Sequence, residues 1–330
     1  MAALERHWSR LTVVSLALLP ISLLFCLLVQ LRWLLHRWRL LPVENMPVPV
    51  IVVGNITVGG TGKTPLVIWL AQILAQAGYR PGIVTRGYRG ESAAWPLAVT
   101  ATTPARLAGD EAVLLARRSV CPVIAGPDRA AGARQLAAQG CNIILSDDGL
   151  QHYRLARDLE IAVIDGIRRF GNGLCLPAGP LREPVSRLDR VALRVTNGVP
   201  AAGEIGMHLD AKGFWNLTEA SRSPMPASYF TSDVHAVAGI GNPERFFATL
   251  RELGLRIVPH AFPDHHAFRP QDLEFGDARP VIMTEKDAVK CETFAKPHYW
   301  ALTVSARPAS GLAERILQRL KESNVGQETA

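Results

Sequence analysis

Short apolar runs alternate along this chain with longer segments in which apolar residues recur at helical spacing. The short runs predict buried β-strands and the longer segments predict helices, an alternation typical of a doubly wound sheet with mainly parallel strands. The first strands are expected at residues 50–53, 83–85, 123–125, 142–145, 161–165 and 191–195. The helices among them are expected at residues 65–77, 110–118 and 130–139.

The pattern weakens over residues 203–227 and then resumes. Further strands are expected at residues 234–238, 256–258, 280–283 and 300–304, with a helix at residues 243–253. A second alternation after such a break predicts a core domain over residues 46–202, followed by a smaller C-terminal α/β domain over residues 203–330. The polar tail after residue 321 is expected to be frayed.

Residues 11–29 contain no charged side chain. A helix of that length extends roughly 28 Å, close to the thickness of the hydrocarbon core of a bilayer. Because residues 30–33 offer no small-residue cleavage site, the segment is expected to persist as an anchor rather than to be removed as a signal peptide. Residues 1–45 are therefore predicted to form a membrane-anchoring helix and a basic, aromatic linker.

The sequence leaves open whether this helix spans the membrane or lies in its interface. Arginines flank the apolar run on both sides, so their distribution gives only a narrow preference for one orientation. A weakly polar stripe follows one helical face and favours an interfacial helix, or a helix that packs on another helix. The stripe consists of Thr12, Ser15, Ser22, Cys26 and Gln30. A buried core helix is the alternative reading.

Composition narrows the class of protein. The 330 residues are 48% hydrophobic and 20% charged, as in a folded globular protein. The formal charge of +7 comes without a basic tract interleaved with aromatic residues, so we expect no nucleic-acid partner, and anionic lipid or a phosphorylated substrate explains the charge better. The five cysteines lack the paired spacing of a zinc site and fit free thiols in a reducing compartment.

A glycine-rich loop at residues 59–64 follows the first predicted strand and opens a helix. Its sequence, Gly-Gly-Thr-Gly-Lys-Thr, predicts a nucleotide phosphate site, because glycines let backbone N–H groups converge on an anion. Lys63 adds a charge for the terminal phosphates, and the Thr64 hydroxyl can ligate Mg²⁺. The predicted nucleotide-binding residues are Thr57, Val58, Gly59, Gly60, Thr61, Gly62, Lys63 and Thr64. Thr57 stands where the general pattern has glycine, and a flexible turn is the alternative.

Paired carboxylates at Asp147 and Asp148 end another predicted strand. An acid at this position of a phosphate-loop protein holds Mg²⁺ or its water shell, and we favour Asp147 over Asp148. A turn or a helix cap is the alternative for this pair. Gln151 and His152 follow closely, so they are expected either in the same crevice or on a surface loop.

A third group of polar residues, Asp264-His265-His266, follows Phe262-Pro263 in a predicted loop. An aspartate beside a histidine can orient the imidazole for acid/base work, and we favour this role or substrate contact over a metal site or a plain surface loop. Asp110, in the first turn of a predicted helix, is by itself most simply explained by the helix dipole. Taken singly, Arg86, Arg182, Glu183, Lys286 and Asp287 are ordinary solvated charges.

Together these motifs resemble those of the tetraacyldisaccharide 4'-kinases, the lipid A 4'-kinases of Gram-negative bacteria. The matching segments occur in order along the chain, at residues 54–65, 86–88, 109–111, 147–152, 177–183, 239–247, 264–266 and 284–290. The resemblance includes the hydrophobic amino terminus, and the shifted first glycine is normal for this family. It implies a P-loop NTPase-like core whose C-terminal domain contributes to the active site.

The resemblance also implies an activity. ATP, with Mg²⁺, phosphorylates the 4'-hydroxyl of a tetraacylated glucosamine disaccharide 1-phosphate, which gives lipid IVA in lipid A and lipopolysaccharide biosynthesis. The reaction is placed at the cytoplasmic face of the inner membrane, whose lipid the protein contacts, with no obligatory protein partner.

The family's residue roles carry over by motif. Lys63 and Thr64 bind phosphates and metal, Asp147 and Asp148 lie in the metal site, and Asp110 with His265 forms the acid/base pair, with His266 as the alternative histidine. The supporting active-site residues are Arg86, Gln151, His152, Arg182 and Glu183. The competing hypothesis is a membrane-tethered P-loop ATPase or GTPase switch that acts on a protein partner, which leaves residues 264–266 without a role.

Overall fold

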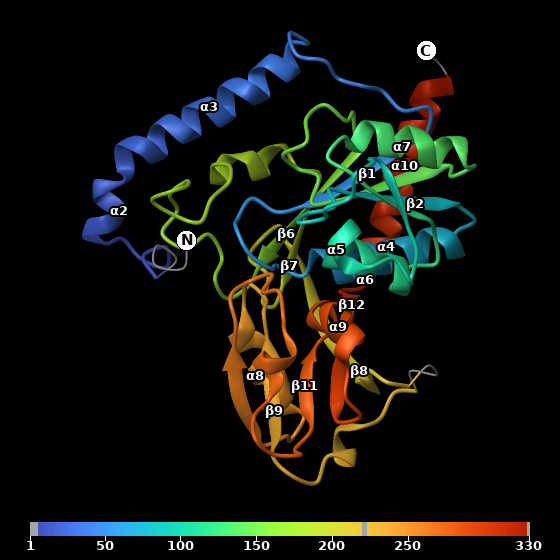
Figure 1. Ribbon diagram of the computed structural model, residues 1–330. Coiled ribbons are helices and arrows are strands. Elements are labelled where there is room, and N and C mark those ends of the chain that lie inside the picture. The colour runs from blue at the N-terminus through green and yellow to red at the C-terminus, as the bar shows by residue number, and fades with distance from the viewer. Residues whose placement is uncertain (1–5, 220–222, 329–330) are drawn as a thin grey trace.

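The computed structural model describes residues 6–219 and 223–328 and is built on one 12-stranded sheet. The strand order is β10-β9-β11-β12-β8-β7-β6-β1-β5-β2-β4-β3. Every neighbouring pair is parallel except β12/β8 and β3/β4. The sheet runs through an upper N-terminal lobe and a lower C-terminal lobe (Figure 1). The predicted α/β class with mainly parallel strands is confirmed.

The N-terminal lobe contains the strands β1 to β7. Their bounds are β1 (Val50–Gly54), β2 (Pro81–Thr85), β3 (Leu97–Val99), β4 (Val123–Ala125), β5 (Ile143–Asp147), β6 (Leu159–Asp165) and β7 (Leu193–Asn197). The helices are α4 (Lys63–Gln76), α5 (Ala105–Ala108), α6 (Asp110–Arg118) and α7 (Arg129–Ala138), with the 3-10 helix η1 at Val185–Arg190. The predicted elements of this lobe are present within a few residues, whereas the short β3 and α5 carry too little periodicity to predict.

Helices cover both faces of this sheet. On one face α4 packs its buried leucines and valines against β1, β2 and β5, and α6 packs beside it against β3 and β4. On the other face α7 packs small residues, including Ala130 and Ala133, against β2, β4 and β5. Because both faces are buried, the central strands read as continuous apolar runs rather than as alternating ones.

The C-terminal lobe repeats the layered plan on a smaller scale. Its elements are β8 (Ile205–Asn216), η2 (Ala227–Tyr229), β9 (Val234–Ala238), α8 (Pro243–Glu252), β10 (Ile257–Ala261), η3 (Pro270–Leu273), β11 (Val281–Thr284), α9 (Glu285–Cys291), η4 (Glu292–Phe294), β12 (Tyr299–Pro308) and α10 (Leu312–Glu328). α8 and α9 pack on opposite sides of the sheet. Asn242 caps α8 by accepting from Arg245 N, and Thr284 caps α9 by accepting from Asp287 N.

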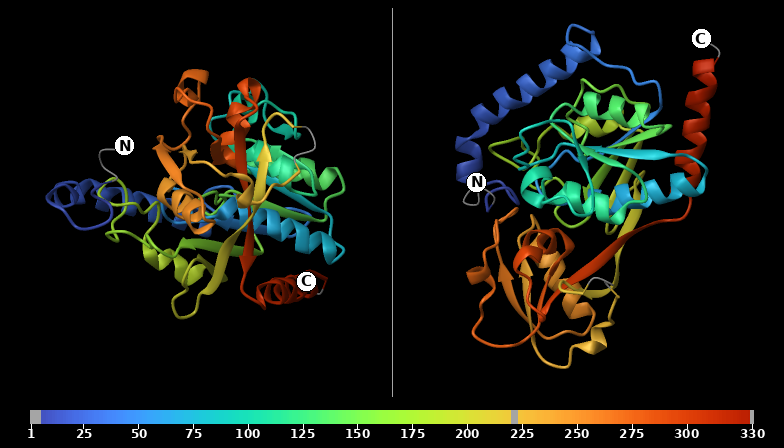
Figure 2. Two further views of the ribbon diagram at one scale, coloured as in Figure 1. Left: turned by 90° about the horizontal axis from the view of Figure 1, so that it is seen from below. Right: turned by 45° about the vertical axis from the view of Figure 1, so that its right-hand side comes forward.

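The long antiparallel pair β8/β12 joins the two lobes. β8 pairs with β7 of the upper lobe at its start and with β12 along its length. β12 then returns the chain to the upper lobe, where α10 lies (Figure 2). Leu312, Ile316 and Leu320 of α10 belong to the N-terminal core. The weak pattern at residues 203–227 thus contains a strand of 12 residues. The last helix, α10, packs in the upper lobe although it lies after residue 202 in the chain. The domain division at residue 202 therefore stays a prediction.

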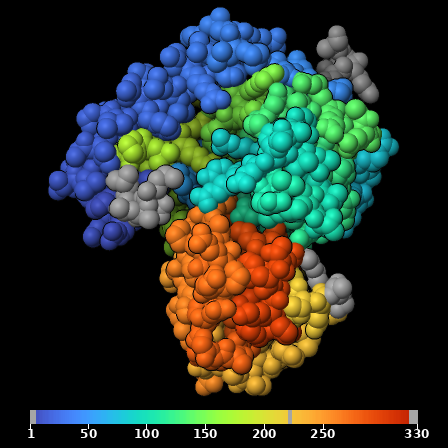
Figure 3. All heavy atoms as spheres, viewed as in Figure 1, coloured from blue at the N-terminus to red at the C-terminus, as the bar shows by residue number. Residues whose placement is uncertain are grey.

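The amino terminus forms the helices α2 (Val13–Ala17) and α3 (Leu19–Arg37) along the upper left edge of the molecule (Figure 3). Pro20 is the second residue of α3, in the first turn, where a proline is tolerated because its missing N–H has no helical partner. α3 is long and apolar enough to cross a membrane. Its polar stripe faces the protein, since Ser22 is buried and donates to the carbonyl of Cys175 at 2.7 Å. The opposite face exposes leucines, among them Leu23 and Leu27.

Candidate active site

The carboxyl ends of the parallel strands from both lobes meet at one place. β1, β5 and β6 are neighbours in the upper lobe and end in the phosphate loop, Asp147 and Asp165, respectively. β9 and β10 of the lower lobe end just before Gly239 and Asp264, and β11 ends at Thr284, the cap of α9. A Cβ atom on Gly241 would lie 2.9 Å from Gly60 N, so only glycine allows the two strand-end loops to touch.

The phosphate loop has the backbone that an anion site requires. Gly62 caps α4 with a φ of +95°, and a Cβ at this position would lie 2.7 Å from Nδ2 of Asn197. Asn197 donates to the carbonyl of Thr61 at 3.1 Å, which fixes the loop from below. The end of α4 that points at the loop is positive, because its first N–H groups lack helical partners.

Lys63 and Asp148 form an ion pair within this loop. Lys63 Nζ lies 3.3 Å from Asp148 Oδ1 and donates to Asn55 Oδ1 at 3.1 Å. Arg182 donates to the same carboxylate at 3.0 Å. Burial raises the pKa of Asp148, but Lys63 and Arg182 outweigh burial and hold that pKa below its usual range. Asp148 is thus ionised and pairs with two cations, Lys63 and Arg182.

Asp147 has a different environment. Its carboxylate is 1% exposed, and neither oxygen has a hydrogen-bond partner among residues 6–219 and 223–328. Burial, followed by the negative charges of Glu111 and Asp148, raises the pKa of Asp147 to about 7. An unpaired buried carboxylate beside a phosphate loop fits a magnesium ligand, because the cation would supply the missing partner. Thr64, in the first turn of α4, carries a hydroxyl of the kind that such a cation would also need.

This environment predicts a pH dependence. Since the folded-state pKa of Asp147 is raised, the metal-free protein binds this proton more tightly than the unfolded chain does, and the stability due to this group is lost as the pH rises through about 7. Differential scanning fluorimetry should therefore show the melting temperature of metal-free wild type falling relative to Asp147→Asn between pH 5 and pH 8. Magnesium with ATP should restore the melting temperature of wild type more strongly at pH 8 than at pH 6. Parallel pH curves for the two proteins would contradict this account.

Gln151 and Glu183 brace the loop that precedes the phosphate site. Gln151 donates to the carbonyl of Asn55 at 3.0 Å and to Glu183 Oε2 at 2.8 Å. Burial raises the pKa of Glu183 despite the hydrogen bond from Gln151 and the charge of Arg187. The backbone N–H of Arg182 donates to the carbonyl of Ile56, so these residues are tied to the start of the phosphate loop.

His152 and Arg86 lie at the margin of this group. Burial, followed by the charges of Arg129 and Arg157, lowers the pKa of His152 to about 4. Arg129 is nearly fully buried, and Asp148 and Asp147 are the negative charges that act on it. Sequence reasoning missed Arg129, whose place at the start of α7 and beside two aspartates only the fold reveals. Arg86 is exposed after β2, with its guanidinium 6.0 Å from the ring of Tyr88.

Asp110 and His265 meet across the lobes. His265 Nδ1 lies 3.1 Å from Asp110 Oδ2, whereas His266 pairs with Asp272 at 2.9 Å. His265 has a φ of +59°, an uncommon backbone for a histidine, and the chain holds it there through its N–H to the carbonyl of Gly239. Burial would raise the pKa of Asp110, but the His265 hydrogen bond and the charge of Lys286 outweigh it, so the pKa is about 2.

Arg168 was not predicted and bridges the phosphate loop to the lower lobe. It donates to the carbonyl of Gly60 at 2.7 Å and to that of Gly241 at 3.0 Å. Asp165 accepts from Arg168 Nε at 3.3 Å and from Arg245 of the lower lobe at 3.0 Å. The sequence signal for this bridge was an aspartate at a strand end followed by arginines, a pattern that also occurs in many ordinary loops.

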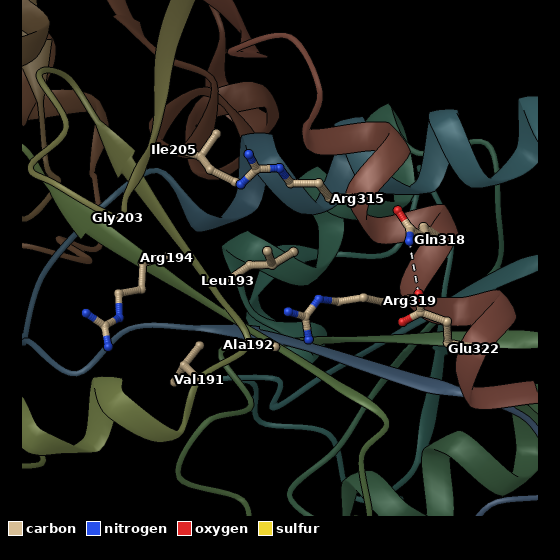
Figure 4. Close-up of a pocket in the computed structure, with 10 residues that line it drawn as sticks. All are labelled: Val191, Ala192, Leu193, Arg194, Gly203, Ile205, Arg315, Gln318, Arg319 and Glu322. Atoms are coloured by element: carbon tan, nitrogen blue, oxygen red, sulfur yellow. Dashed lines mark hydrogen bonds between the residues drawn. The ribbon is translucent and has the colours of Figure 1, made fainter. Parts of the chain in front are cut away.

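A separate cavity of about 730 Å³ lies between β7 and α10 (Figure 4). Arg194, Arg315 and Arg319 are among the residues that line it. It includes none of the predicted site residues, and the chemistry-bearing residues instead gather where the strand ends of the two lobes meet.

Comparison with known proteins agrees with this geometry. The tetraacyldisaccharide-1-P 4'-kinase family matches residues 14–321. A tetraacyldisaccharide 4'-kinase of Nitrosococcus oceani is 50% identical over 319 residues, covering 96% of this chain and 94% of the relative, and one of Alkalilimnicola ehrlichii is 53% identical over 301 residues, covering 91% of each. A crystal structure of LpxK from Aquifex aeolicus in complex with ATP has a TM-score of 0.76 and 28% identity, with 94% of this chain and 99% of that one covered. With its phosphate loop, its paired aspartates and a match over nearly its whole length, the chain belongs to the tetraacyldisaccharide 4'-kinase family.

Proposed function

We propose that this protein is an ATP-dependent kinase that phosphorylates the 4'-hydroxyl of a tetraacylated glucosamine disaccharide 1-phosphate and so produces lipid IVA. The observation that carries the proposal is the joining of two half-sites, a phosphate loop with Lys63 in the upper lobe and the Asp110–His265 pair across the lobe interface. Phosphoryl transfer needs little covalent chemistry from the protein beyond positioning, charge neutralisation and acceptance of one proton.

The residues divide this work by position. The phosphate loop and Lys63 hold the β- and γ-phosphates, while Arg182 and Asp148 keep Lys63 in place. Thr64 and Asp147 would hold Mg²⁺, which when bound neutralises charge on the phosphates. Asp110 accepts the proton of the sugar hydroxyl as its oxygen bonds to the γ-phosphorus and ADP leaves. His265 orients the Asp110 carboxylate through the 3.1 Å contact.

We also propose that residues 1–45 hold the kinase core (46–202) at the cytoplasmic face of the inner membrane, where the acylated substrate resides. The loop at residues 171–184 links α3 to the phosphate loop. Its Cys175 carbonyl accepts a hydrogen bond from Ser22 of α3, and its Pro180 carbonyl accepts one from Val58 N at 2.8 Å. Trp33 on α3 stacks under the guanidinium of Arg190 at 3.6 Å. The substrate can therefore reach the site without leaving the bilayer, and residues 203–330 supply His265 from the other side.

Membrane attachment through the outer face of α3 is testable. Leu23 and Leu27 are about 60% exposed, and burying one leucine in lipid contributes about 2 kcal/mol, so Leu23→Gln with Leu27→Gln should lower liposome binding by a hundredfold or more. Sedimentation with anionic vesicles measures this loss. The control is Val199→Gln, a similarly exposed apolar residue outside α3, which should bind as wild type does. Equal binding by the α3 variant would contradict anchoring by this face.

The membrane-tethered switch is the weaker hypothesis, because the chain belongs to a kinase family and the Asp110–His265 contact would have no role in a switch. The deciding experiment incubates detergent-solubilised protein with labelled ATP, Mg²⁺ and the disaccharide 1-phosphate. We expect label on the 4'-oxygen and nucleotide consumption that depends on the lipid. Label on another hydroxyl would overturn the substrate assignment, and lipid-independent hydrolysis would favour the switch.

A further inference from the structure

Lys286 reaches the far side of the His265 ring. It lies in the first turn of α9, and its Nζ atom is 3.1 Å from His265 Nε2. The same ammonium donates to Glu111 Oε1 at 2.9 Å and lies 3.5 Å from Asp264 Oδ1. The side chains of Lys286 and His265 are only 16% and 12% exposed, so water screens these contacts weakly.

An ammonium group has three hydrogens to donate and no lone pair to accept with. His265 Nε2, in contact with Lys286, must therefore be the acceptor and carry no proton, which leaves the ring proton on Nδ1, directed at Asp110. We propose that Lys286 is a positioning residue that holds His265 as the neutral Nδ1–H tautomer. The catalytic meaning of this inference rests on the proposed function, whereas the tautomer itself is a property of the free protein.

The charges around the ring show why a lysine is needed there. Two carboxylates face the imidazole, Asp110 at 3.1 Å from Nδ1 and Asp264 at 3.8 Å from Nε2, and this arrangement by itself favours a doubly protonated, positive ring. The Lys286 ammonium opposes that second proton by its charge and by occupying the Nε2 lone pair. The edge of Tyr88 also packs on the ring, with centroids 4.8 Å apart, and Arg89 donates to the backbone carbonyl of His265.

A second lysine on the same helix provides a natural comparison. Lys290 lies one turn later, 2.7 Å from Asp287 and 3.8 Å from Asp110, and it pairs with these carboxylates rather than with the ring. The two lysines thus divide two tasks, with Lys290 balancing the Asp110 charge and Lys286 setting the ring proton. In this arrangement His265 directs its only N–H at Asp110, and the carboxylate remains the group that accepts the substrate proton.

The test is the protonation of His265 Nε2, read from ¹⁵N ring shifts of histidine-labelled protein without substrate. His265→Gln identifies the signals among the nine histidines. In wild type at pH 7.5 we expect an unprotonated Nε2 and a protonated Nδ1. In Lys286→Met the ring should gain the second proton at a pH higher by at least about one unit, because the repelling charge is gone. Lys286→Arg, which also only donates, should keep the wild-type pattern.

Lys290→Met is the matched control, since it removes the same charge from the same helix without a ring contact. The shift of its ring signals should be clearly smaller than that of Lys286→Met. The inference is overturned by a protonated Nε2 in wild type at pH 7.5, by an unchanged titration in Lys286→Met, or by equal shifts in both methionine variants. If Lys286→Met does not fold, the wild-type and arginine spectra still decide. The ring measurement uses no lipid, so it is independent of any failure of the kinase assay.

Discussion

Replacing Lys63 with alanine is expected to lower kcat by about 10³-fold or more, the size of effect seen when a main electrostatic contact to a transferring phosphoryl group is removed. Lys63 is the cation that opens α4, and it is held over the phosphate loop by Asn55 and Asp148. Its loss also leaves the Asp148 carboxylate beside the phosphates with Arg182 as its remaining close ion-pair partner. Both changes raise the barrier, because negative charge in the site then goes uncompensated.

The measurement is single-turnover transfer from labelled ATP to the disaccharide 1-phosphate in detergent micelles. Vesicle binding should be unchanged, since Lys63 does not belong to α2 or α3. Lys212→Ala is the control, because Lys212 is an exposed lysine of β8 that pairs only loosely with Asp210 at 3.6 Å, and it should retain wild-type turnover. Near-normal transfer by Lys63→Ala would reject the assignment of the phosphate site.

Removing either member of the Asp110–His265 pair should cost about 10²- to 10⁴-fold in kcat, the usual range for a group that accepts a proton in the transition state. The 3.1 Å contact means that the two residues act as one unit. The losses of Asp110→Ala and His265→Ala should therefore fail to multiply in the double variant, which should resemble the worse single variant.

The control for this cycle is His266, which differs from His265 by one position. Its ring pairs with Asp272 within the lower lobe, so His266→Ala should lose little turnover. In the double variant with Asp110→Ala, the two fold losses in kcat should multiply. Fully multiplicative losses for Asp110 and His265 would assign separate roles to these residues. A larger loss at His266 than at His265 would transfer the acid/base role to the second histidine.

Local signals made much of the upper lobe predictable. The phosphate loop is a contiguous run of six residues, and Asp147 is the last residue of β5, which pairs directly with β1. Strand-end residues of adjacent parallel strands must lie close together, so sequence order nearly fixes their proximity. The Asp110–His265 contact is of another kind, since 155 residues separate its members and no spacing rule joins them. The family resemblance supplied that pair.

Other features had no local signal. β8 was read as a boundary because an antiparallel connector with glycine in its middle lacks the apolar run of a buried parallel strand. The helix α10 follows a polar and apolar pattern that does not reveal which lobe it covers. Pro20 lies in the first turn of α3, and the apolar run alone does not reveal that a helix begins there.

The sequence by itself determined the phosphate loop, the alternation of strands and helices, and the apolar amino terminus, because each depends on residues close together in the chain. Tertiary structure alone decided that His265 rather than His266 meets Asp110, that Lys286 contacts the far nitrogen of that ring, and that Asp147 is left unpaired while Asp148 is neutralised. These outcomes depend on how two lobes place their strand ends face to face. Ion pairs and hydrogen bonds depend on separations of a few ångströms in space, and the separation of two residues along the chain does not set that distance.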